Sequence, residues 1–294
     1  MRPKEFNALI ALLEDPDNEV NRVVTDKIMH EGTLIVPLLE KVWEQSTSSI
    51  LQKKIEVIVN NIQFQAAKEN LTKWVDEGEQ NLLEGAVNVA KFQYPQIEAG
   101  AIEEQLEKIR KDVWLELNET HTALEKVKTL NHIFYGVHGF SGNTTNFFAP
   151  QNHYINQVVE SKKGGPVALA ICYSVVAQRL GMPIYGVSLP KNYLLAYKDR
   201  YSQQHKGNAT SDSILFYINP FNKGTVLGRK EIESFLVQNK IEVKDEYFAP
   251  CKNSVTISQL IASLMIAYQK SGNMEKVDQL QFLLNIVANQ TEQE

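Results

Sequence analysis

The spacing of apolar residues along the chain changes near residue 118, and this change predicts two kinds of secondary structure. Up to about residue 105, apolar residues recur every three or four positions, which is typical of amphipathic helices. Further along come short apolar runs bounded by Gly, Pro and Asn, which predict strands of a small antiparallel sheet. These runs are IYGVSL (184–189), YLLAY (193–197) and ILFYINP (214–220). The predicted fold class is therefore α+β, with a helix over 166–180 leading into the first strand.

The same patterns predict three domains in a chain of 294 residues, which is long enough for more than one. An all-helical domain is expected over residues 1–105, an α+β core over 106–252 and a helical hairpin over 253–294. In the hairpin, Gly272 suits the left-handed residue that ends a helix.

Both flanking domains carry local resemblances to helical repeats. In the first, the helix junctions at Asp15, Val20, Gly32 and Pro37 resemble a HEAT-type repeat, and an irregular helical domain is the alternative. In the last, the segment AYQKSGNMEKVDQL is similar to one tetratricopeptide unit. The alternative there is an ordinary helical hairpin that closes the core.

The composition argues against several classes of partner. The formal net charge is −5, so the chain as a whole has no basic footprint for nucleic acid. No apolar run approaches the ~20 residues that span a bilayer, and the N-terminal segment reads as a helix rather than a signal peptide. Two cysteines make no disulfide framework, so a cytoplasmic protein is expected. No metal-binding or nucleotide-binding motif occurs, so no metal or other cofactor is expected.

Cys172, in the stretch GGPVALAICYSVVAQRLGMP, is the one candidate nucleophile. A nucleophilic cysteine is activated at a helix N-terminus and by a nearby histidine. A helix that begins at Pro166 places Cys172 almost two turns inside, on an apolar stripe with Leu169, Val176 and Leu180. The pattern therefore favours a core side chain. A cysteine hydrolase or acyltransferase that pairs Cys172 with His205 or an upstream histidine is the alternative.

Several separated blocks of sequence occur in an order that identifies a family. They are LNHIFYGVHGFSGN (130–143), the run from APQNHY to NYLLAY (149–197) and FYINPFNKG (216–224). Together they resemble the bacterial transglutaminase-like family of SirB type, over roughly residues 105–290. The resemblance implies a transglutaminase/papain-like core with a helical segment before it and a tetratricopeptide-like segment after it.

The resemblance also implies where catalytic residues would lie. Catalytic members use a Cys that opens a helix and a His and an Asp on the strands that follow, and SirB-type blocks read Gly-x-Pro-x-Ser, Pro-Gly-His-Phe and Asp-Pro-Phe. Laid on this sequence, the nucleophile position is Ala168, the histidine position is Asn192 and the aspartate position is Asn219. Alanine has no nucleophile, and a neutral amide is neither a general base nor a counter-charge for an imidazolium. Cys-His-Asp catalysis is therefore not expected.

Two roles are open for the vacated positions. The amides of Asn192 and Asn219 either hydrogen-bond each other and pin two strands, or line a cleft for a peptide or small polar ligand. In the second case Tyr193, Tyr173 and Phe221 are the expected aromatic walls. The aromatic loop with Phe140, Phe147 and Phe148 is expected to pack into the core, with a lid or a partner contact as the alternative. The expected function is an interaction or scaffold module with a protein partner, or a regulatory one.

Overall fold

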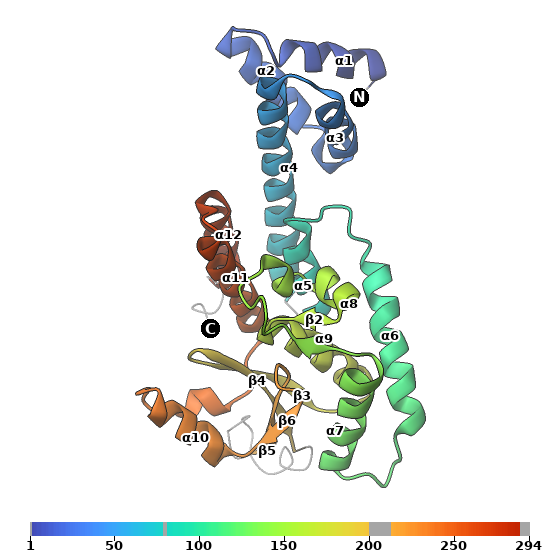
Figure 1. Ribbon diagram of the computed structural model, residues 1–294, viewed down its shortest axis with the longest axis vertical. Coiled ribbons are helices and arrows are strands. Elements are labelled where there is room, and N and C mark those ends of the chain that lie inside the picture. The colour runs from blue at the N-terminus through green and yellow to red at the C-terminus, as the bar shows by residue number, and fades with distance from the viewer. Residues whose placement is uncertain (1, 79–80, 200–212, 289–294) are drawn as a thin grey trace. The chain divides into compact units, whose positions relative to one another are not determined.

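A computed structural model describes residues 2–78, 81–199 and 213–288 and confirms the α+β fold class (Figure 1). By their internal contacts the residues divide into two units, one of residues 1–70 with 91–96 and one of residues 71–90 with 97–294. The domain boundaries predicted at residues 105 and 252 stay predictions. Within the described residues, no helix is both long enough and apolar enough to cross a membrane.

The first unit is built from helices that follow the predicted apolar spacing. They are α1 (Pro3–Leu12), α2 (Asn18–Met29), the 3-10 helix η1 (Gly32–Ile35), α3 (Val36–Gln45) and the first part of α4 (Ser49–Asp76). Asp17 caps α2 by accepting a hydrogen bond from the Glu19 backbone N–H, which satisfies a donor that the helix leaves free. Leu13, Ile28 and Leu39 are fully buried in the shared core. The HEAT-like character of this unit stays a prediction.

The second unit contains the remaining helices. They are the end of α4, α5 (Leu82–Lys91) up to Ala90, α6 (Ala99–Glu116), α7 (Ala123–Asn131), the π-helix η2 (His132–Val137), η3 (Pro150–His153), α8 (Ile155–Ser161), α9 (Pro166–Arg179), α10 (Arg229–Gln238), η6 (Asp245–Phe248), α11 (Asn253–Lys270) and α12 (Met274–Ala288). The last two form the predicted hairpin, and Gly272 between them has φ +78°. Glycine adopts this left-handed conformation without strain.

One antiparallel sheet contains the three predicted strands and one more. Its order is β3 (Ile184–Leu189), β4 (Asn192–Lys198), β5 (Ile214–Asn219) and β6 (Thr225–Leu227). Leu195 of β4 lies opposite Ile218 of β5. Because these two strands are antiparallel, the start of β4 and the end of β5 lie at the same end of the strands, which is called the sheet edge below. That edge carries Asn192 and Asn219.

Helix α9 lies at the centre of the second unit (Figure 1). Every side chain from Val167 to Ala177 is buried, and the helix packs on β3, β4, α6, α8 and α11. A helix that is apolar all round is found inside a core rather than at a surface. Just before it, β2 (Lys163–Gly164) pairs in parallel with β1 (Ser141–Gly142), so Gly142 lies opposite Gly164. This pairing fixes where the chain enters α9.

The packing of α5 on α11 predicts an unusual response to a glycine substitution. A Cβ at Gly85 would lie 2.8 Å from Cζ2 of Trp74 and 2.9 Å from Cγ1 of Ile257. We expect Gly85→Ala to lower the free energy of unfolding by about 1–3 kcal/mol, although alanine is the better helix former. Urea unfolding measures the change.

Gly100→Ala on α6 is the matched control, since a Cβ there meets nothing within 4 Å. It is expected to leave stability unchanged or to raise it by up to about 1 kcal/mol. Equal effects of the two substitutions would contradict the close packing at Gly85.

Candidate functional site

The three positions matched to a catalytic triad lie on α9, β4 and β5. Ala168 is the third residue of α9 and is fully buried, Asn192 opens β4 and Asn219 closes β5. A chain of contacts connects the end of β5 with the start of α9. Phe221 packs against Gly142, where a Cβ would lie 2.7 Å from its ring, and Gly142 lies opposite Gly164. The helix N-terminus and the sheet edge therefore belong to one structural region.

The two asparagines bond to their own local backbone. Oδ1 of Asn219 accepts hydrogen bonds from the N–H groups of Phe221 and Asn222, both at 3.1 Å, which makes an Asx turn. Oδ1 of Asn192 accepts from the Tyr193 N–H at 2.9 Å. Of the two roles left open, the mutual hydrogen bond is not found within the described chain; each amide oxygen instead accepts from backbone N–H groups next to it in sequence. Local amide-to-backbone bonds compete well with long-range ones at strand ends.

Two of the predicted aromatic wall residues are buried inside the second unit. Tyr173 is fully buried, and its hydroxyl donates to Oδ1 of Asn131 at 2.8 Å. Tyr193 is also buried, and its hydroxyl lies 2.6 Å from Oγ1 of Thr256 on α11. Burial raises the pKa of both phenols far above the ordinary value, so both stay neutral. As placed here, these two rings fill the core rather than face an open cleft.

The turn that follows Asn219 is tied by side chains to the end of α7 and to the π-helix η2. The Tyr135 hydroxyl donates to the Pro220 carbonyl oxygen at 2.9 Å, and Nδ2 of Asn131 donates to the Gly224 carbonyl oxygen at 2.9 Å. Sequence reasoning missed both groups because their partners lie 85 and 93 residues further along the chain. A π-helical turn often marks a functional site. Here it aims Tyr135 at the turn that carries the matched aspartate position.

Cys172 has the properties of a core side chain. Its exposed fraction is zero, and desolvation raises the pKa of its thiol to about 12. A thiol with this pKa is almost entirely protonated at neutral pH, whereas a cysteine nucleophile reacts as the thiolate. His205, the histidine suggested as its partner, lies outside the described residues. Among the described residues, no group of three or more His, Cys, Asp or Glu side chains could hold a metal ion.

A buried histidine lies behind the N-terminus of α9. His153 is 4% exposed, its Nδ1 has no hydrogen-bond partner, and a Cβ on Gly165 would lie 2.8 Å from its Cε1. Desolvation lowers the pKa of His153 to about 4. The imidazole is therefore neutral at pH 7 and packs where the chain enters α9.

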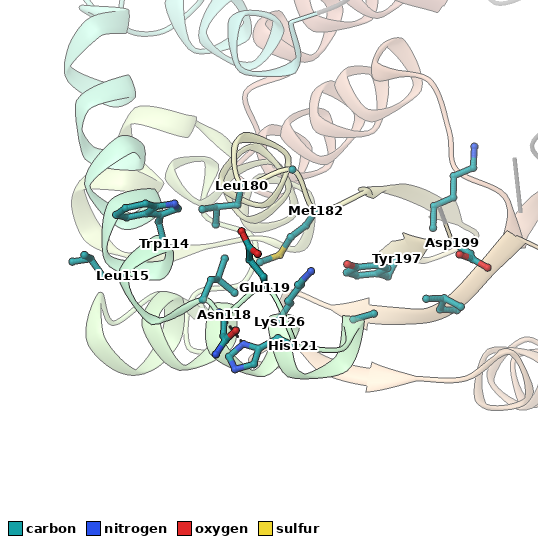
Figure 2. Close-up of a pocket in the computed structure, with 15 residues that line it drawn as sticks. Trp114, Leu115, Asn118, Glu119, His121, Lys126, Leu180, Met182, Tyr197 and Asp199 are labelled. Atoms are coloured by element: carbon teal, nitrogen blue, oxygen red, sulfur yellow. Dashed lines mark hydrogen bonds between the residues drawn. The ribbon is translucent and has the colours of Figure 1, made fainter. Parts of the chain in front are cut away.

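One opening in the described part of the second unit lies away from the triad positions. Figure 2 shows this cavity of about 830 Å³, whose lining includes Trp114, Glu119, Lys126, Met182 and Tyr197. Trp114 is 62% exposed at its edge. None of the three matched positions lines it. Sequence reasoning missed this cavity, because its walls come from four separate segments, residues 114–126, 180–182 and 197–199 and Leu215.

The neutral state of His153 predicts a specific pH dependence. The unfolded chain binds a proton at His153 with a pKa near 6.5 and the folded chain at about 4, so the unfolded state holds more protons between these values. The free energy of unfolding should therefore fall by roughly 3 kcal/mol as the pH drops through this window. Urea unfolding at about pH 7 and about pH 4.5 measures this loss.

The variant His153→Gln should remove most of that loss, since glutamine does not titrate. The matched control, His132→Gln, replaces an exposed histidine and should leave the slope as it is. If the free energy of unfolding of His153→Gln still falls with pH as in the wild type, groups other than His153 cause the loss.

Comparisons with known proteins place these features in a family. A family model described as the transglutaminase-like superfamily matches residues 100–262. A UPF0162 protein of Xylella fastidiosa (strain 9a5c) is 26% identical over 225 residues, which cover 74% of this chain and 76% of the relative. A UPF0162 protein of Vibrio cholerae is 26% identical over 189 residues, covering 63% and 66%.

A longer protein matches the same region. F-box only protein 21 of Mus musculus is 26% identical over 166 residues, which cover 56% of this chain and only 25% of that protein. No solved structure matches this chain with comparable significance. The family model covers more than half of the chain and includes α9, the four-stranded sheet and the three matched positions. The chain therefore belongs to the transglutaminase-like superfamily.

Proposed function

We propose that this protein is a non-catalytic, SirB-type member of the superfamily that acts as an interaction or scaffold module. The observation that carries the proposal is the set Ala168, Asn192 and Asn219 at the positions matched to Cys, His and Asp. Methyl and neutral amide groups cannot attack an acyl carbon, take up its proton or stabilise an imidazolium by charge. The core would then be retained for its architecture.

The surroundings of these positions support the proposal. Ala168 has no exposed surface, and the oxygens of both amides already accept backbone hydrogen bonds. The alternative, a hydrolase or acyltransferase based on Cys172, has the burial and the raised pKa of that thiol against it.

The proposed partner is a protein. In F-box only protein 21 a region similar to this one is a quarter of a longer chain, which is what a module reused in different contexts would show. We place the protein in the cytoplasm because Cys172 and Cys251 are both free thiols in the structure. Metals, nucleotides, nucleic acid and membranes have no part in this proposal.

The proposal predicts that the purified protein does not turn over acyl substrates. Rates on a panel of p-nitrophenyl esters and glutamine-containing peptides should equal the rate without protein. Absorbance measures the hydrolysis of the esters, and ammonia release measures reaction at the glutamine side chains.

The variants Cys172→Ala and Cys251→Ala should give the same background rate, and the second is the control for loss of a thiol outside the helix. Turnover by the wild type that Cys172→Ala abolishes and Cys251→Ala retains would contradict the proposal.

A further inference from the structure

We propose that the sheet edge at the vacated triad positions is a docking surface for an acidic segment of a partner protein. This inference rests on the proposed function and specifies which surface binds and what chemistry it recognises. The surface consists of an aromatic centre, Phe147, Phe148 and Phe221, and of the exposed lysines around it.

The aromatic centre is partly exposed. Phe147 and Phe148 are 39% and 48% exposed. The Phe147 ring lies edge-on to Phe148 at 5.1 Å between centroids and edge-on to Phe221 at 5.6 Å. Exposed aromatic rings that already pack against each other are well suited to anchor a partner, since Phe side chains bury a large area on binding.

The loop that carries these rings is held in place by buried amides. Nδ2 of Asn152 donates to the carbonyl oxygens of Asn146 and Phe147, and its Oδ1 accepts from Nδ2 of Asn143 at 2.9 Å. Asn152 is 3% exposed, so these bonds are protected from water. A loop fixed in this way loses little conformational entropy when a partner binds.

Four chain segments meet at this surface. The turn before β4 and the turn after β5 lie at the same sheet edge, because the two strands are antiparallel. Phe221 in the second turn contacts both Phe147 and Gly142, and β1 pairs with β2 just before α9. The segments are residues 140–154, 161–170, 190–194 and 219–225.

The charge of these four segments is entirely positive. They contain Lys162, Lys163, Lys191 and Lys223 and no Asp, Glu or Arg, in a chain whose formal net charge is −5. The last three of these lysines are exposed. Lys270 of α11 adds a fifth, with its Nζ 5.6 Å from the Phe148 ring centroid. A basic rim around an apolar centre is complementary to an acidic segment with an apolar anchor.

The backbone conformation of the turns does not favour lysine at three of these positions. Lys162, Lys191 and Lys223 have φ of 60°, 64° and 49°, a left-handed conformation that glycine adopts with less strain. A side chain kept at a strained position is consistent with a role for its charge.

A protein segment fits this surface better than nucleic acid. Phosphate groups are recognised preferentially by the bidentate guanidinium of arginine, and these segments have none. The Phe147 ring is also engaged by two other rings, which leaves it a poor platform for stacking bases.

Fluorescence anisotropy with two labelled dodecapeptides tests the proposal on the full chain. One peptide alternates Glu and Asp around a central Phe-Leu pair, and the other has Gln and Asn in place of every acidic residue. The acidic peptide should bind at least about tenfold more tightly, and added salt should weaken it, as expected for a charged rim.

The variant Lys191→Gly/Lys223→Gly removes two charges while it relaxes the backbone, so it should fold at least as stably as the wild type. It should bind the acidic peptide about tenfold more weakly. Phe148→Ala should also weaken binding. The matched control is Lys240→Gly, which changes an exposed lysine of the same conformation (φ 57°) at the end of α10 and should leave affinity unchanged.

Equal binding of both peptides, an effect of Lys240→Gly as large as that of the double variant, or tighter binding of a poly-uridine oligonucleotide would overturn the inference. If the acidic peptide does not bind and no substrate is turned over, only this docking surface is wrong. If mass spectrometry finds the peptide cleaved or modified, the proposed non-catalytic function is wrong as well.

Discussion

The burial of α9 on all sides is the constraint on which the rest of the second unit depends. Its eleven consecutive buried side chains hold the sheet on one side and α6, α8 and α11 on others. The same burial removes water from Cys172 and Ala168, so that no side chain of this helix is ready for acyl chemistry. The packing around α9 thus does not depend on a reactive side chain.

Under the proposed function, neutral groups at the matched triad positions keep the local geometry without a charge. Asn219 makes the Asx turn with the same carbonyl-type oxygen that an aspartate would use. The turn it forms is then secured by Tyr135 of the π-helix η2 and by Asn131, the last residue of α7. The Asx turn at this sheet edge therefore does not need an ionised aspartate.

The sequence predicts those parts of the fold that depend on local patterns. The start of α9 at Pro166, the three longer strands and the glycine turn at Gly272 all follow from periodicity and from residues that begin or end elements. The pairing of β1 with β2 was not predicted, since two-residue strands have no periodic signal.

The environment of individual side chains was harder to predict than the elements. Tyr193 would be a wall residue if the two asparagines lined a cleft, yet its hydroxyl lies 2.6 Å from Oγ1 of Thr256, 63 residues further along the chain. The alternative, a mutual bond between Asn192 and Asn219, is replaced by bonds with adjacent backbone groups. Such choices are set by tertiary packing and by competition among nearby donors, which one sequence does not reveal.

The central claim, that the core no longer holds a reactive nucleophile, is tested most directly by the rate of thiol labelling against pH in Cys251→Ala protein. Cys172 should stay unlabelled in the native state and react only after unfolding, because its thiol is fully buried with a pKa raised to about 12. Rapid labelling of the native protein, with an apparent pKa well below the unperturbed value near 8.5, would reveal an activated thiolate and contradict the account.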